Sequence, residues 1–249
     1  MKSLQEYINE SESKTDLSTN KVQPKTKDEL KEIIKDTFEH KQYDLNFINT
    51  SEITDMSKLF INCKYNFDIS EWDVSNVTDM NHMFYDCDNF NCDLSKWNVS
   101  KVVNMFSTFS SCKKFEGKGL ENWDVSAVTD MHYMFYECEN LNCDLSDWDV
   151  SNVVNMWHLF DGCKKLDCDL SDWNVSKVKD MTSMFNGCKN FNCNLSRWNM
   201  SKVRNISYMF YNCTSFKGER LYMWDVSNID DAIKTFNGCN KLTIPNWYK

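Results

Sequence analysis

The side chains best suited to chemistry in this sequence are histidines and aromatic residues that recur at related positions. Tyr, Trp and Phe are the residues that most often anchor protein interfaces. We expect them to lie on one exposed face and to form a binding surface for a protein or a glycan. The candidate binding residues are His82, Tyr85, Phe106, His132, Tyr133, Tyr136, Trp157, His158, Tyr208 and Tyr211.

A second interpretation of these rings is purely structural. They would stack on one another along the chain and stabilise neighbouring repeats without binding a partner. The corresponding positions of the sixth repeat are Thr182, Ser183, Asn186 and Gly187, and this interruption favours the structural interpretation for the C-terminal half.

Metal binding is a further alternative for two sets of residues. His82, His132 and His158 carry the imidazole that metals most often bind, but no carboxylate is clearly placed as a third ligand. Asp68, Asp93, Asp144 and Asp169 recur at one position and supply the oxygen ligands that calcium prefers, yet Asn194 continues the series and indicates turn hydrogen bonding instead. We predict neither a metal nor a cofactor.

Catalysis finds no support in the sequence. There is no phosphate-binding glycine loop, no nucleophile elbow and no H-E-x-x-H motif. Nearly every polar residue belongs to a repeated position, whereas a catalytic residue must be unique. We therefore predict that the protein is not an enzyme.

The 12 cysteines also occupy repeated positions, from Cys63 onwards. Stacked repeats would place them over one another, about 4.8 Å apart. Reduced cysteines that pack as small apolar residues are one interpretation, and disulfides are another. No C-x-x-C pair is present, which disfavours zinc.

An internal repeat must position all of these residues. Residues 148–163 read W-D-V-S-N-V-V-N-M-W-H-L-F-D-G-C, and variants of this stretch recur along the chain. Eight phenylalanines mark the period, and the steps between them are 24, 25, 26, 25, 25, 25 and 26 residues. They are Phe60, Phe84, Phe109, Phe135, Phe160, Phe185, Phe210 and Phe236. A repeat of this length predicts units that stack on their neighbours to bury a shared core.

Each repeat divides into two halves. Met131, Met134, Phe135 and Cys138 have the i, i+3, i+4, i+7 spacing of one face of a two-turn helix. Residues 142–151 alternate apolar and polar residues, as short strands do. Before the repeats, Thr26 and Glu29 form a capping pattern ahead of a helix with Leu30, Ile33, Ile34 and Phe38 on its apolar face.

The consensus W-[D/N]-V-S-x-V-x-[D/N]-M-x-x-M-F-x-x-C-x-x-[F/L]-N-x-D-L-S resembles the BspA-like leucine-rich repeats. The variant it is similar to was first noted as a domain of unknown function in mycoplasma surface lipoproteins. The resemblance covers about residues 50–249 and implies a right-handed leucine-rich-repeat-like solenoid with a role in adhesion or protein binding. Members occur on bacterial or protist surfaces and in viruses.

We thus expect an α/β repeat fold, a right-handed leucine-rich-repeat-like solenoid of about eight 25-residue coils. Each coil would hold short strands plus a two-turn helix, and a helical cap would precede the first. The expected domains are a flexible leader and linker at 1–25, the cap at 26–50 and the repeats at 51–249.

Composition limits the partners and the location. The net charge of −9 disfavours nucleic acid and anionic lipid, which attract basic surfaces. No apolar run approaches the ~20 residues of a membrane span. The start of the chain has no signal-peptide core and no lipid-attachment cysteine, which favours a cytoplasmic or virion-associated protein.

These observations predict a non-catalytic recognition or adhesion module. The alternative is a structural or packaged component, such as a virion protein, directed by a short amphipathic peptide at residues 1–10. The sequence does not determine the oligomeric state.

Overall fold

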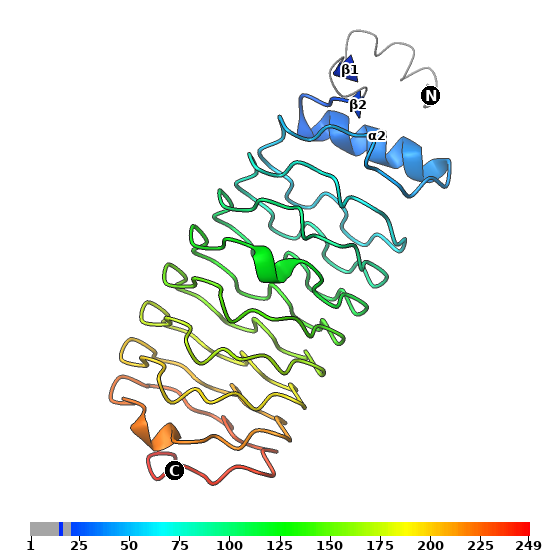
Figure 1. Ribbon diagram of the computed structural model, residues 1–249. Helices are drawn as coiled ribbons and strands as arrows, with labels where there is room; N and C mark the ends of the chain where they lie inside the picture. Colours follow the sequence, from blue (N-terminus) through cyan, green and yellow to red (C-terminus); the bar gives the residue numbers. More distant parts are fainter. Residues whose placement is uncertain (1–14, 17–20) are drawn as a thin grey trace.

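The structure is a computed structural model that describes residues 15–16 and 21–249. Figure 1 shows an elongated stack, with helix α2 at one end and the C-terminal repeat at the other. The amphipathic peptide predicted at residues 1–10 lies outside the described residues, as does most of the predicted leader.

Helix α2 (Lys27–Glu39) covers the N-terminal end of the stack. The Thr26 side chain accepts a hydrogen bond from the Glu29 amide at 3.2 Å, and Leu30, Ile33 and Ile34 are buried. The helix predicted from this capping pattern is confirmed. Before it, strands β1 (Thr15–Asp16) and β2 (Lys21–Val22) pair antiparallel.

From residue 55 onwards the chain forms layers, and one residue in each layer makes a parallel bridge to the next. We call each layer a winding, from one bridge residue to the next. The eight residues of this continuous bridge series are Asp55, Asp79, Asn104, Asp130, Asn155, Asp180, Asn205 and Asp231. Successive repeats therefore lie against one another in chain order.

The predicted α/β solenoid is wrong. Within the described residues the structure has a single α-helix, α2, and β1 and β2 are two residues each. The windings contain neither the predicted strands nor the predicted two-turn helix, but turns, isolated bridges and two 3₁₀ helices, η2 (Leu120–Asn122) and η3 (Leu221–Met223).

Residues 131–138 show why the apolar spacing of a helix occurs here without a helix. The Met134 amide bonds to the Met131 carbonyl at 3.1 Å and the Cys138 amide to the Phe135 carbonyl at 3.0 Å, which makes two turns in series. Within the first turn, Tyr133 adopts a left-handed φ of 57°. Its amide donates to the Trp157 carbonyl of the next winding at 3.0 Å, not to its own segment. Two four-residue turns bury the same positions as a helix, so the predicted core residues are correct although the element is not.

The core consists of columns of identical side chains. Phe135 and Phe160 stack at 5.6 Å between ring centroids, and Trp148 and Trp173 stack at 6.4 Å. Each tryptophan also spans two windings, as when the Trp148 indole donates to the Leu120 carbonyl at 2.8 Å. Every winding thus covers its neighbour's apolar surface, which explains why the fold needs a repeat.

Aspartate and asparagine side chains form the corners. Asp149 accepts a hydrogen bond from the Ser151 amide at 2.9 Å, and Asn174 accepts one from the Ser176 amide at 3.2 Å. These are Asx turns, in which the side chain satisfies a backbone amide two residues later. In each case the acceptor is the Asp or Asn side chain two residues before the serine.

Candidate functional site, a face of aromatic and histidine side chains

The turns in series direct the predicted site residues outward. In residues 131–138, the buried Met131, Met134 and Phe135 alternate with partly exposed His132, Tyr133 and Tyr136. Equivalent residues in adjacent windings lie side by side because their backbones are hydrogen-bonded. The Tyr133 amide donates to the Trp157 carbonyl at 3.0 Å, for example.

Eight of the ten predicted residues form one continuous set of ring contacts. The His82 ring meets the edge of Phe106 at 4.4 Å, and Phe106 stacks on His132 at 3.9 Å. Tyr133 stacks on His158 at 4.6 Å with ring planes only 4° apart. We call this set the aromatic face, which comprises His82, Tyr85, Phe106, His132, Tyr133, Tyr136, Trp157 and His158.

Tyr208 and Tyr211 form a separate pair. Their rings lie 5.7 Å apart, and the Lys234 ammonium lies 5.9 Å from the Tyr208 centroid. Thr182 and Ser183 occupy the intervening winding, so among the described residues no ring connects this pair to the aromatic face. The sequence grouped all ten residues, and the structure brings eight together.

The aromatic face is partly exposed. Tyr85 and Trp157 each expose 38% of their surface, while the other six residues are partly buried against one another. The rings therefore stack among themselves and still expose part of their surface to solvent, so the two interpretations drawn from sequence do not exclude each other.

Two histidines of the face pair with carboxylates. His158 Nδ1 lies 2.7 Å from Asp161, which is buried, and His132 Nδ1 contacts Asp130. Each pairing fixes the orientation of an imidazole and leaves Nε2 as the ring nitrogen available to a partner. Asp130 and Asp161 were not singled out in the sequence, although Asp161 follows His158 by three residues.

Two other groups of the face, His82 and Tyr136, have pKa values shifted toward the uncharged form. Burial lowers the pKa of His82, and the nearby positive charge of Lys58 lowers it further. Burial raises the pKa of Tyr136 to about 12, with the carboxylates of Glu137 and Asp161 adding to the effect. The Tyr136 hydroxyl is therefore a neutral hydrogen-bond donor at physiological pH.

Comparison with known families identifies the repeat. The family model described as "Mycoplasma protein of unknown function, DUF285" matches residues 28–148, 104–223 and 134–247. The chain belongs to this family. No curated protein matches the sequence.

The DUF285 family carries no assigned function, so the site rests on geometry alone. The match supports the mycoplasma-type repeat that the consensus resembles, and not a BspA-like leucine-rich-repeat assignment specifically. In the residues that the structure describes, no helix is long and apolar enough to cross a membrane.

The cysteines of this DUF285 chain are all free thiols. One column runs through the core, where each thiol donates to a phenylalanine carbonyl of the preceding winding. Cys163 does so to Phe135 at 3.1 Å and Cys188 to Phe160 at 3.0 Å. This bond gives the sulfur a role beyond apolar packing.

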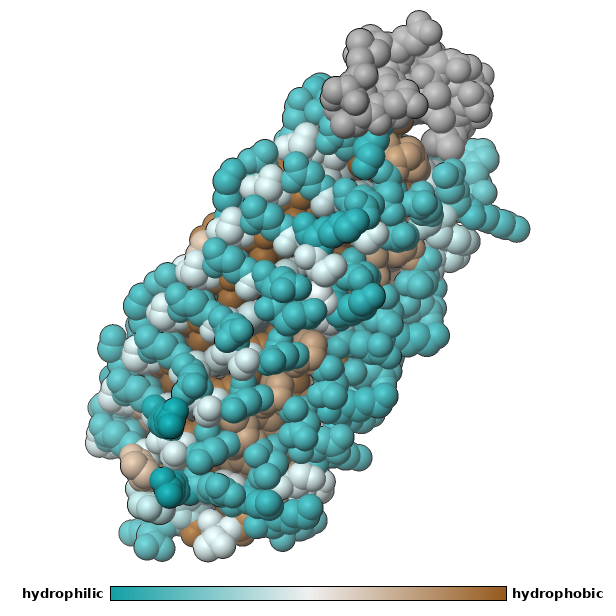
Figure 2. Space-filling model, viewed as in Figure 1, coloured by the Kyte–Doolittle hydropathy of each residue, from teal (hydrophilic) through white to brown (hydrophobic). Residues whose placement is uncertain are grey.

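A second cysteine column lies beside the repeated aspartates. Figure 2 shows hydrophobic residues in a broken line along the face that carries η2, bordered by hydrophilic ones. Cys168, Cys193 and Asp169 line a cavity of about 440 Å³ here, and burial raises the pKa of Cys193 to about 12. Within the described part of the chain, no three His, Cys, Asp or Glu residues are grouped to hold a metal.

Asp169 already has partners for its oxygen. Its Oδ1 accepts the Ser171 amide at 2.9 Å and the Cys193 thiol at 3.3 Å. These bonds support the turn-forming interpretation of the aspartate series over the calcium alternative.

Proposed function

We propose that this protein is a non-catalytic recognition module that binds a protein or a glycan through the aromatic face. The observation that carries the proposal is the continuity of the face. Eight aromatic and histidine residues from four successive windings make unbroken ring contacts, with Tyr85 and Trp157 most exposed.

The backbone beneath the face supports a binding role. Phe106 and Trp157 each lie two residues after a bridge residue whose side chain accepts their amide, at 3.1 Å in both cases. A backbone held in this way loses little conformational freedom when the face binds a partner, and such preorganisation improves affinity. Rigid aromatic side chains also supply large contact areas at low entropic cost.

The polar atoms of the face suit a partner with hydrogen-bonding groups. The Tyr136 hydroxyl, hydrogen-bonded to the Glu137 carboxylate, places a polar pair on this face. Ring faces accept the apolar faces of side chains or sugars, and Tyr and Trp combine this with polar contacts at their edges. A protein surface and a glycan both satisfy these requirements.

Capture by matched variants tests the proposal. Wild-type protein, a Tyr85→Ser/Trp157→Ser variant and a Tyr208→Ser/Tyr211→Ser control would be applied to a glycan array and to cell-surface extracts. We expect wild type and control to retain a ligand that the first variant loses. Equal capture by all three folded proteins would contradict a role for the aromatic face.

Two narrower assignments are supported by the sequence and not by the structure. A relationship to BspA-like repeats and a role in adhesion, on a cell or in a virion, are supported by the repeat consensus alone. The packaged-component alternative depends on residues 1–10, which lie outside the described residues, and no contact in the described part favours it.

A further inference from the structure

The backbone amides of the turns form a regular series that joins one winding to the next. In the seventh winding, the amides of residues 206, 208, 210 and 212 all point toward the eighth. They donate to the carbonyls of Asp231, Ile233, Thr235 and Asn237 at 2.8 to 2.9 Å. The same alternate-residue pattern occurs between the earlier windings, as from Phe84 to Thr108 and from Phe160 to Met184.

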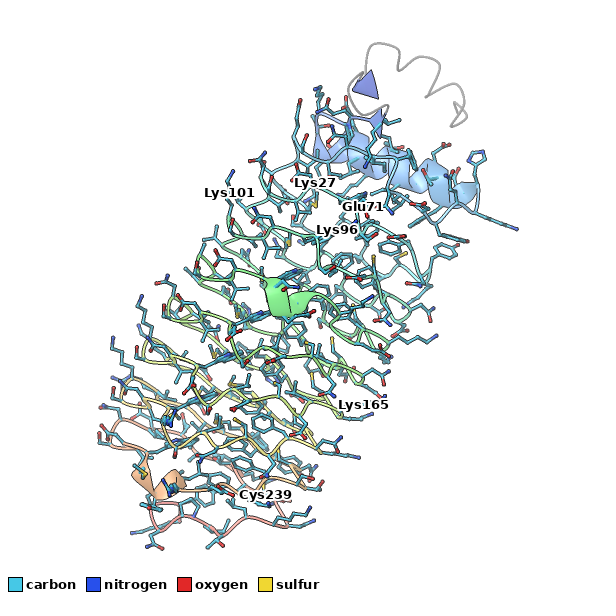
Figure 3. The ribbon with its side chains drawn as sticks, viewed as in Figure 1. Lys27, Glu71, Lys96, Lys101, Lys165 and Cys239 are labelled. Carbon is cyan, nitrogen blue, oxygen red and sulfur yellow. The ribbon has the colours of Figure 1, made fainter. Side chains whose placement is uncertain are left out.

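The eighth winding carries the same amides without acceptors. Ala232, Lys234, Phe236 and Gly238 occupy the equivalent positions, and within residues 15–16 and 21–249 no hydrogen bond takes up their amides. Lys234 and Gly238 keep the left-handed φ of the series, at 52° and 83°. The donor row is therefore already in its binding geometry. It lies at the end of the stack where Figure 3 labels Cys239.

The side chains at this end are only partly covered. Trp247 and Tyr248 lie 5.9 and 5.0 Å from the Phe236 ring and cover the end of the phenylalanine column. Ile233 and Ile244 remain 57% and 49% exposed. The open feature of this end is thus a row of amides with the exposed Ile233 side chain among them, which suits a narrow segment better than a broad domain surface.

Neither described end of a second copy of the chain fits this row. Its own eighth winding offers donors, and two donor rows repel. Its first winding is covered by α2, where the Lys27 ammonium bonds to Asp55 at 2.9 Å and Leu30 and Ile33 are buried. The acceptors for this row must therefore be carbonyls outside the described residues.

We propose that the eighth winding is a docking edge for an extended segment of another protein. Carbonyl oxygens at every second residue of that segment accept the amides of Ala232, Lys234, Phe236 and Gly238, and an apolar side chain packs beside Ile233. This is recognition by addition of an extended peptide to an open backbone edge. The geometry required is the one repeated at each internal junction between windings.

Amide hydrogen exchange with a defined peptide tests the proposal. The probe is a synthetic peptide with the sequence of residues 204–213 and serine in place of its cysteine, because this stretch supplies such carbonyls inside the stack. In the free protein, the four amides of the eighth winding should exchange much faster than those of residues 206–212. Saturating peptide should slow them roughly tenfold or more, whereas a scrambled peptide should not.

An Ala232→Pro variant gives a second readout. It removes one donor that has no acceptor in the described chain, so the fold should persist, as circular dichroism would verify, while peptide affinity falls. The proposal would be overturned if the four amides were already protected in the free monomer, or if peptide left their exchange unchanged. Protection that rises with protein concentration alone would also overturn it, in favour of self-association.

Discussion

Hydrogen bonds to backbone carbonyls explain the residue types at the repeated core positions. Trp148 donates its indole N–H to Leu120 across a winding, and Cys163 donates its thiol to Phe135. A buried carbonyl that loses its donor is costly. Tryptophan and cysteine therefore supply both apolar packing and a bond that phenylalanine or alanine lacks.

Replacing a core tryptophan tests this role. We expect Trp148→Phe to lower the free energy of unfolding by about 1–3 kcal/mol, because the Leu120 carbonyl loses its donor inside the core. Trp157→Phe is the matched control, because the Trp157 indole is 38% exposed. Urea titration measures both, and equal effects would show that the indole bond contributes nothing.

The thiols make stability depend on alkaline pH. Burial raises the pKa of Cys143 from 9.0 to about 12 and that of Cys193 similarly. A thiol whose pKa is higher in the folded than in the unfolded protein stabilises the folded state below the unfolded pKa. This stabilisation is lost as the pH rises toward the folded pKa. We therefore expect the urea midpoint to fall above about pH 9.

The control for this pH dependence is a Cys143→Ala/Cys193→Ala variant. It should lose less stability between pH 8 and pH 10 (roughly one unit either side of the unfolded thiol pKa) than wild type does. A midpoint that falls equally in both proteins would assign the effect to other groups.

At the scale of elements, the sequence predicted positions better than conformations. Helix α2 and the burial of Met131, Phe135 and Trp148 followed from apolar spacing and capping. The two-turn helix did not form, because two turns with a left-handed residue in each bury the same positions. Spacing alone does not distinguish them, since the difference lies in whether the Tyr133 amide bonds locally or to the next winding.

The candidate site was likewise predicted in part from the sequence. Repeat alignment brought His82 through His158 together correctly, because equivalent residues of adjacent windings stack. It grouped Tyr208 with them, although Thr182 and Ser183 of the intervening repeat carry no ring and separate Tyr208 from the cluster. The carboxylate partners of His132 and His158 depend on side-chain conformations that the sequence does not specify.

A glycine substitution can test how closely the segment before η2 packs against the neighbouring winding. Gly119 precedes η2 with a φ of +93°, and a Cβ there would lie 2.1 Å from the Ser95 amide nitrogen of the neighbouring winding. We expect Gly119→Ala to cost about 3 kcal/mol or more, because strain and a backbone clash combine. Thermal unfolding would measure the loss.

Gly187→Ala is the matched control for this change. Gly187 also has a positive φ, of +70°, but the nearest atom to an added Cβ is 3.8 Å away. Only the left-handed conformation then opposes alanine, at about 1–2 kcal/mol. If the two variants lost equal stability, the close approach at Gly119 would be unimportant.

At the scale of the whole molecule, each winding contacts its neighbours and little else. Exposed ion pairs also join windings, such as Lys96 with Glu71, both labelled in Figure 3, and Arg197 with Asp172 at 2.8 Å. Exposed pairs of this kind contribute little individually. Backbone bonds, side-chain columns and Asx turns therefore supply most of the stability.

Added salt tests how much the exposed ion pairs between windings contribute to stability. Since about 1 M sodium chloride reduces the screening length to about 3 Å, it weakens the exposed pairs and leaves buried columns intact. We expect the urea midpoint to change little on adding the salt. A large fall in the midpoint would mean that the ion pairs between windings hold the stack together.

The central claim is tested most directly by measuring how ligand affinity changes when an aromatic ring is removed inside or outside the aromatic face. With the captured protein or glycan as titrant, calorimetry would compare wild type with Trp157→Ala and Tyr208→Ala. If the aromatic face binds the ligand, Trp157→Ala should lower the affinity roughly tenfold or more, since exposed rings at the centre of an interface dominate binding. Tyr208→Ala should leave the affinity almost unchanged. Equal affinities for all three proteins, or a greater loss at Tyr208, would contradict the account.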